Sequence, residues 1–213
     1  MRYRLSVPSA RGIAGIVLAV WLAAAPWSAS ADSNARPAGW AKPVVSTALQ
    51  NCYQLDEALY RSAQPDRKGF EEARKKGIRT IINLRSEHSD AKLVEGLGLN
   101  LIEIPLNAGL FSDDQILSAL RAIQTSPKPV LIHCQHGSDR AGVVSAAYRV
   151  VLQGWAKDEA VAELKKGGFG FHRWYLNIPA FIKGLDVAGF RGRLAAQVPA
   201  SSPQQAQGPG GLK

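Results

Sequence analysis

The sequence predicts an α/β domain in which a central, mainly parallel sheet of four to five strands is covered by helices. Three observations carry this prediction. The chain of 213 residues is long enough for one domain with a sizeable core. Between residues 52 and 187, short apolar runs alternate with segments whose apolar residues recur at helical spacing. Turn-forming and capping residues separate these segments, and such alternation is typical of sheets whose strands are joined by helices.

The strand candidates are short runs of apolar and β-branched residues between turn-forming residues. They comprise two runs within residues 52–62, then residues 80–84, 100–104 and 129–132. Leu55-Asp56-Glu57 would form the turn between the first two runs. The last run, Pro129-Val130-Leu131-Ile132, leads directly into a polar segment that begins at His133.

The helix candidates repeat apolar residues at spacings of three and four, so that these residues share one face. They are residues 66–76, 90–96, 113–124, 141–152, 157–166 and 177–187. Asp66 can cap the first helix and Gly77 ends it. The third helix has its apolar face at Ile116, Leu117, Leu120 and Ile123.

Residues 1–31 are typical of a secretory signal peptide. Three arginines precede an apolar run of about 14 residues, Gly12–Ala25, and small residues follow it. The run is shorter than the ~20 residues that span a bilayer. We expect cleavage after Ala31 and an exported protein, periplasmic or secreted. An uncleaved membrane anchor is the alternative, and it also places the domain outside the cytoplasm.

The rest of the chain divides by composition into three parts. Residues 32–47 carry no periodicity and would form a leader, and residues 48–190 would form the folded domain. Residues 191–213 are expected to be a disordered tail, because the end of the chain is rich in Gln, Ser, Pro and Gly.

The charge of the chain limits its partners. The 26 Lys and Arg residues against 17 Asp and Glu residues give a net charge of +9, which suits an anionic substrate. The charges are scattered rather than grouped in blocks, so we expect no nucleic-acid partner. After removal of the signal peptide we expect no stable membrane insertion, and we expect a monomer.

The segment from His133 to Arg140 has the residues needed to hold a phosphate group. It lies between a predicted strand and a predicted helix, where backbone N–H groups can form a nest and the helix dipole favours an anion. Gly137 permits tight curvature. Arg140, six positions after Cys134, can present a bidentate guanidinium to two phosphate oxygens. The predicted phosphate-binding residues are Gln135, His136, Gly137, Ser138, Asp139 and Arg140.

Cys134 is the predicted nucleophile. Donors that bind phosphate also stabilise a thiolate, so we expect this thiol to be ionised near neutral pH. Attack on phosphorus would give a phosphocysteine intermediate that water hydrolyses, while Arg140 and the backbone hold the oxygens. This chemistry needs no metal and no cofactor. Pairing with Cys52 would block it, so we interpret Cys134 as a free thiol and Cys52 as a structural residue.

At these positions the chain resembles the protein tyrosine phosphatase superfamily, whose signature is His-Cys-x-x-Gly-x-x-Arg. Leu59-Tyr60-Arg61-Ser62-Ala63-Gln64-Pro65 is similar to an early motif of its atypical dual-specificity branch, whose members are often bacterial. The resemblance covers roughly residues 52–185. It implies a dual-specificity phosphatase-like fold and hydrolysis of phosphate monoesters on phosphotyrosine or phosphoserine/threonine proteins. It also implies that His133 positions the loop rather than acting as a base.

Two positions depart from the family pattern. The family usually has Ser or Thr directly after the loop arginine to help the thiolate leave, whereas Ala141 stands here, so hydrolysis of the intermediate is expected to be slow. The family also has an acidic Asp after the strand that corresponds to residues 100–104, whereas the first carboxylates here are Asp113 and Asp114. Asp113 is the catalytic acid candidate, provided that a closing loop carries it inward. The alternative is that both residues only begin the next helix.

Other functions remain open at this point. A weakly active phosphate-binding module, or pseudophosphatase, would explain both departures, and a phosphatase of inositol phosphates is a further alternative. The segment from Gln135 to Asp139 contains no lysine, which favours a phosphoprotein substrate. A rhodanese-type sulfurtransferase is disfavoured, because its loop is commonly shorter. A zinc site at His133, Cys134 and His136 is disfavoured as well, because these residues crowd too closely.

Several further residues receive structural interpretations. We expect Trp155, Trp174 and Tyr175 to pack in the fold, and His172 to lie at the surface. We expect Arg85 to form a structural pair. Asp139 is expected to orient neighbouring groups, and His136 is expected either to contact substrate or to be simply exposed.

Overall fold

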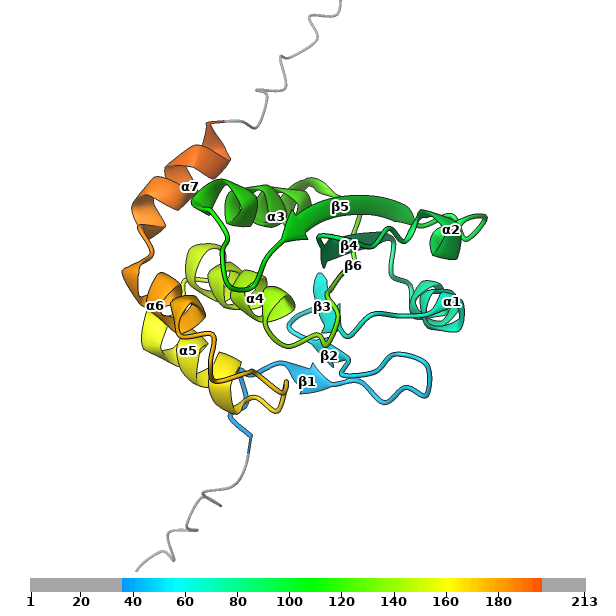
Figure 1. Cartoon of the computed structure of the whole chain (residues 1–213), viewed down its shortest axis with the longest axis horizontal. Helices are drawn as coiled ribbons and strands as arrows, with labels where there is room; N and C mark the ends of the chain where they lie inside the picture. The colour runs from blue at the N-terminus through cyan, green and yellow to red at the C-terminus, as the bar shows by residue number, and fades with distance from the viewer. Residues whose placement is uncertain (1–35, 197–213) are drawn as a thin grey trace, which may run out of the picture. The chain divides into compact units, whose positions relative to one another are not determined.

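A computed structural model describes residues 36–196 of the chain, which belong to one compact unit (Figure 1). Its sheet has six strands in the order β1-β2-β3-β6-β4-β5. They are β1 (Lys42–Pro43), β2 (Tyr53–Gln54), β3 (Leu59–Ser62), β4 (Thr80–Arg85), β5 (Asn100–Leu106) and β6 (Val130–His133). Strands β3, β6, β4 and β5 run parallel, whereas β1 and β2 join the sheet by antiparallel pairing. The predicted α/β fold with a mainly parallel sheet is confirmed.

Different helices cover the two faces of this sheet (Figure 1). Neighbouring residues of a strand point to opposite faces. Ile81 and Leu131 therefore pack with Phe70 on the face covered by α1 and α2, whereas Ile82 and Ile132 face the larger cluster that includes α3 to α7. The helices are α1 (Arg67–Lys75), α2 (Ala91–Val94), α3 (Asp113–Thr125), α4 (Arg140–Val151), α5 (Lys157–Lys166), α6 (Asn177–Gly184) and α7 (Val187–Ala195). Within the described residues, none of the helices has the length and apolar character needed to cross a membrane.

The two residues predicted to begin and end the first helix, Asp66 and Gly77, lie at the two ends of α1. The side chain of Asp66 accepts a hydrogen bond from Gly69 N at 2.8 Å and so caps α1. Gly77, just beyond this helix, has a positive φ of 88°, which a residue with a side chain rarely adopts. The expected signal peptide lies outside the described residues, as does the expected tail beyond residue 196.

The structure corrects the strand count and both boundaries of the folded domain. β1 lies inside the expected leader of residues 32–47, because a two-residue strand has no periodicity and is defined only by its pairing with β2. The first residues of the expected tail, 191–195, belong to α7, which buries Phe190 and Leu194. The helix expected over residues 177–187 ends at Gly184, and Asp186 then caps α7.

The His133–Arg140 motif lies at the centre of the fold, between β6 and α4. We call residues 134–139, which connect these two elements, the cysteine loop. In the sheet, His133 at the end of β6 lies between Ser62 of β3 and Asn83 of β4. α4 is buried along almost its whole length, so the loop is held between two interior elements. This is the carboxyl edge of the sheet, where α/β folds bind ligands.

Candidate active site

A pocket of about 320 Å³ opens above the cysteine loop. The structure brings five of the predicted site residues to it, namely Cys134, Gln135, His136, Asp139 and Arg140. Three other segments complete its lining: Ser86 after β4, Leu106 to Ala108 at the end of β5, and His172, Trp174 and Tyr175 before α6. Cys134 is only 2% exposed and is a free thiol. A buried thiol beside an arginine and a helix N-terminus has the surroundings of a reactive cysteine.

Gly137 and Ser138 shape the cysteine loop without lining the pocket. Gly137 has a φ of 71°, and a Cβ at this position would lie 2.6 Å from the backbone nitrogen of Ala63. No side chain fits there, so β3 and the loop can approach closely only at a glycine. Ser138 is buried and donates its hydroxyl to the carbonyl of Phe169 at 2.7 Å. The side chain of Ser138 is thus used within the fold, and the predicted contact of residue 138 with phosphate is that of its backbone N–H group.

Arg61 of β3 contacts the cysteine loop on the side that does not line the pocket, which we call the rear side. Its guanidinium donates to the carbonyls of Gly137 and Ser138 at 2.6 and 3.1 Å and lies 3.9 Å from the ring centre of Phe169. Burial lowers the pKa of Arg61 to about 10, although the negative charge of Cys134 opposes this shift. Arg61 therefore stays charged at neutral pH. Arg61 lies in the Leu59–Pro65 segment that resembles a family motif, but its role was not evident from the sequence.

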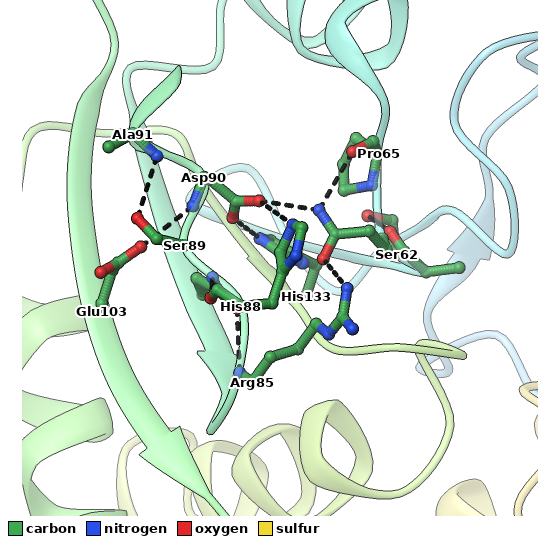
Figure 2. A network of polar contacts seen from close by, with 12 residues as sticks. Ser62, Pro65, Arg85, His88, Ser89, Asp90, Ala91, Glu103 and His133 are labelled. Atoms are coloured by element: carbon green, nitrogen blue, oxygen red, sulfur yellow. Dashed lines mark hydrogen bonds and ion pairs between the residues drawn. The ribbon is translucent and has the colours of Figure 1, made fainter. Parts of the chain in front are cut away.

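His133 belongs to a buried polar network on the same rear side, which Figure 2 shows. Its Nε2 donates to Asp90 Oδ2 at 2.7 Å. Gln64 donates to the other carboxylate oxygen at 2.8 Å and accepts from Arg85 at 2.9 Å. Burial alone would raise the pKa of Asp90, but the hydrogen bonds and charge supplied by His133, Gln64 and His88 hold it below its usual range. The predicted structural roles of His133 and Arg85 agree with these contacts.

The front of the pocket carries a second carboxylate–imidazole pair. His172 donates through Nδ1 to Asp139 Oδ2 at 2.7 Å, and its backbone N–H donates to Asp139 Oδ1 at 3.0 Å. Asp139 precedes α4 but makes no capping bond to that helix, because both of its oxygens serve His172. The expectation that Asp139 orients a neighbour is confirmed, whereas the expectation of a surface His172 is wrong. His172 is half-buried, and the chain path that brings it to Asp139 is not visible in the sequence.

Two aromatic residues near His172 also differ from expectation. Trp174 stacks on the His172 ring with centroids 4.4 Å apart, and it remains 71% exposed. Tyr175 lines the same pocket. These residues are therefore walls of the site rather than packing aromatics. Trp155, by contrast, packs under the guanidinium of Arg149 at 4.0 Å, as a structural aromatic does.

Asp113 does not reach this pocket. It is exposed in the first turn of α3, whose cap is Ser112, and it lines a separate depression with Phe181 and Leu185. Asp114 pairs with Arg193. In this structure the predicted acid Asp113 is therefore not part of the pocket that contains Cys134, because it lies in the first turn of α3. The residue that the β5 loop does bring to the pocket is Asn107, whose side chain accepts from Gly109 N at 2.8 Å.

Side chains of the pocket also include residue types that can bind a metal ion. Within residues 36–196, one group of side chains could hold a metal ion: His136, Asp139 and His172, with ligand atoms within 4.8 Å of one another. Two of these atoms already share the hydrogen bond between Asp139 and His172.

Cys52 is buried, and burial raises the pKa of its thiol to about 11. Cys52 is thus unreactive at neutral pH, in agreement with its predicted structural role.

Comparison with known proteins points to one family. A family model described as PTP-NADK, a DSP-PTPase phosphatase fused to NAD+ kinase, matches residues 38–174. The dual specificity protein phosphatase TpbA of Pseudomonas aeruginosa is 32% identical over 177 residues, which are 82% of this chain and 80% of TpbA. Inositol diphosphatase DSP3 of Arabidopsis thaliana is 26% identical over 151 residues, or 66% of this chain and 72% of that protein.

Solved structures give the same picture. The crystal structure of P. aeruginosa TpbA matches with a TM-score of 0.68 at 32% sequence identity and covers 76% of this chain and 99% of that one. A cysteine-to-serine variant of TpbA in complex with phosphotyrosine matches with a TM-score of 0.67 at 31% identity, with the same coverage.

Proposed function

The chain belongs to the dual-specificity phosphatases of the protein tyrosine phosphatase superfamily and is a cysteine-based phosphatase, and from this premise we propose that it dephosphorylates phosphotyrosine in proteins. The observation that carries the proposal is the aromatic wall of the pocket. Trp174, Tyr175 and two histidines line the pocket together with Cys134 and Arg140. Aromatic side chains favour stacked and edge contacts with a phenyl ring, such as that of phosphotyrosine. An inositol phosphate offers no such ring.

The charges of the pocket support the same substrate. Within the described residues, no lysine lines the pocket, and Arg140 is its one permanently charged cation. A single guanidinium with the backbone N–H groups of the cysteine loop suits one phosphate dianion. A substrate with many phosphates would require more cations. The likeness to TpbA, which has been crystallised as a variant with phosphotyrosine, is consistent with this proposal.

The reaction follows from the positions of these groups. The thiolate of Cys134 attacks phosphorus, the ester bond breaks, and a phosphocysteine intermediate forms. Arg140 and the N–H groups at the start of α4 hold the phosphoryl oxygens in both steps. Asp139 does not cap α4, so its carboxylate leaves these N–H groups available to the anion. Water then hydrolyses the intermediate and regenerates the thiolate.

We further propose that the enzyme acts outside the cytoplasm. The arginines and the apolar run of residues 2–25 support this location. Cell fractionation and N-terminal sequencing of the full chain test it: we expect an exported protein that begins at Asp32, and a cytoplasmic protein that keeps Met1 would contradict the proposal.

Activity on purified protein tests the substrate. We expect the chain to hydrolyse a phosphotyrosine peptide in EDTA faster than a phosphothreonine peptide or an inositol pyrophosphate. Cys134→Ser should abolish hydrolysis while the phosphotyrosine peptide still binds. Equal activity of this variant would refute the cysteine mechanism, and a preference for the inositol substrate would refute the phosphoprotein. Binding of the peptide without turnover by the unmodified chain would indicate the phosphate-binding module instead.

A further inference from the structure

The active site lacks a proton donor at the position where the family carries one. A phenolate is a poor leaving group, so cleavage of phosphotyrosine needs an acid at the ester oxygen. The loop after β5 reaches the pocket, but it presents Leu106, Asn107 and Ala108 there. The amide of Asn107 has no proton to transfer at neutral pH. An acid must therefore come from another segment that lines the pocket.

His172 is placed to supply this proton. Asp139 fixes both its backbone and its ring, and the bond at Nδ1 leaves Nε2 as the ring nitrogen not used by Asp139. A buried carboxylate that holds one imidazole nitrogen orients the ring and stabilises its charged form. Stacking on Trp174 restricts the ring from the other side. The ring lines the pocket that also contains Cys134.

The segment before His172 is anchored to the cysteine loop itself. The carbonyl of Phe169 accepts from Ser138 Oγ at 2.7 Å and from Asn51 Nδ2 at 3.0 Å. The ring of Phe169 lies against the guanidinium of Arg61. Gly168 and Gly170 on either side have positive φ values, so the chain bends there in a way that suits glycine. The position of His172 relative to the nucleophile is thus fixed by the same residues that fix the loop.

We propose that His172, oriented by Asp139, is the general acid and base of this phosphatase. In the first step the Cys134 thiolate forms the S–P bond, the P–O ester bond breaks, and the leaving oxygen takes the electron pair and the Nε2 proton of His172. In the second step water gives a proton to Nε2 as its oxygen bonds phosphorus. The S–P electron pair then returns to Cys134, and phosphate is released. This role rests on the proposed function.

His136 is the competing imidazole in this pocket. Its ring meets that of His172 edge-on, with centroids 5.5 Å apart. Within residues 36–196 its ring has no hydrogen bond, whereas His172 has a carboxylate partner at 2.7 Å. His136 is also exposed and therefore free to turn. The titratable or charged groups that share the pocket with His172 are Asp139, His136, Cys134, Arg140 and Tyr175.

A leaving-group comparison tests the proposal. In His172→Asn, the new amide can still donate to Asp139, so the anchoring is kept while the transferable proton is lost. We expect kcat/KM for phenyl phosphate, which has a poor leaving group and whose kcat/KM reports the first step, to fall by roughly 10²–10⁴-fold. For p-nitrophenyl phosphate, whose leaving group needs little protonation, we expect kcat/KM to fall by less than about tenfold. The matched variant His136→Asn removes another pocket imidazole, so it should lower kcat/KM for both substrates by the same factor, and the ratio between the two substrates should stay that of the unmodified chain.

The pH profile provides a second readout. With phenyl phosphate, the pH dependence of kcat/KM should differ between the unmodified chain and His172→Asn, because only the unmodified chain transfers a proton from this position. Inhibition by vanadate should be unchanged in that variant, which would show that the phosphate cradle is intact.

Four results would overturn the proposal. An equal loss of kcat/KM on both substrates in His172→Asn would leave His172 with a structural role only. A leaving-group-dependent loss in His136→Asn or Asp113→Asn instead would assign the acid there. Loss of activity in EDTA would assign His136, Asp139 and His172 to a metal ion. Activity that survives Cys134→Ser would refute the proposed function. If His172→Asn kept the same ratio of kcat/KM between the two substrates as the unmodified chain, only this inference would be refuted.

Discussion

Behind the cysteine loop, polar side chains are buried and paired, whereas in front of it they are partly exposed and stacked on one another. The rear side consists of Arg61 and the network of Asp90 and His133. The front consists of His136, His172 and aromatic walls, with Asp139 behind them. Buried, hydrogen-bonded groups fix a geometry, while groups at a pocket mouth meet the substrate. The rear residues therefore position the phosphate-binding loop, whereas the front residues determine substrate preference and transfer protons.

Arg61→Met should have the largest effect on the rear side. The substitution removes both hydrogen bonds to the loop carbonyls and leaves these buried acceptors without a donor, so we expect the free energy of unfolding to fall by roughly 2–5 kcal/mol. A displaced cradle should also lower kcat/KM by about 100-fold. Urea unfolding and steady-state kinetics measure the two effects. Arg85→Met, at the outer part of the rear network, is the matched control and should cost less than about 1 kcal/mol. Equal stability losses in the two variants would contradict this division.

Asp90→Asn should have a smaller effect, and this effect should depend on pH. The folded-state pKa of Asp90 is held below its usual value, so its stabilisation is complete above the unfolded-state pKa of about 3.9 and is lost as pH falls through the folded-state value. At pH 7 we expect the variant to lose roughly 1.5–3 kcal/mol, because hydrogen bonds to a charged group are weakened. The deficit should shrink as the pH is lowered below about 4.

Urea unfolding across this pH range measures the deficit. Asp158→Asn is the control, because Asp158 is exposed and its pairing with Lys183 should contribute little. A deficit in Asp90→Asn that stays constant with pH would show that its charge does not hold His133.

Trp174→Ala should have the smallest effect, confined to the front side. The loss of an exposed aromatic contact of roughly 0.5–1.5 kcal/mol corresponds to an increase of about 2- to 12-fold in KM for a phosphotyrosine peptide. Inhibition by inorganic phosphate should not change, because Trp174 lies beside the substrate ring rather than at the cradle. Weaker inhibition by phosphate would instead place Trp174 among the residues that shape the cradle.

The sequence predicted the centre of the site better than its front. Cys134, Gly137 and Arg140 lie within one short segment, so their spacing alone encodes a loop around a phosphate. His172 and Asp139 are far apart in the chain, and their contact depends on how the chain returns after α5. Gly168 and Gly170 have positive φ values in the structure, but the sequence did not indicate that the bend there brings His172 to Asp139. Asp113 was misleading because acidic residues at a helix start resemble acidic residues at a site.

The same distinction holds for the fold. Helices and parallel strands with a regular apolar pattern were predicted within a few residues, as α5 over Lys157–Lys166 illustrates. β1 was missed because a two-residue strand depends wholly on its partner, β2. α7 was missed because its apolar face consists of little more than Phe190 and Leu194 within a segment that contains two glycines.

Trapping of the covalent intermediate tests the central claim most directly. The chain is mixed with a phosphotyrosine peptide, quenched during turnover, digested and analysed by mass spectrometry. The geometry of the cysteine loop predicts one phosphoryl group on Cys134, with none on Cys52, whose thiol stays protonated at neutral pH. A phosphoryl group on a histidine, or turnover without any labelled Cys134 peptide, would contradict Cys134 as the nucleophile.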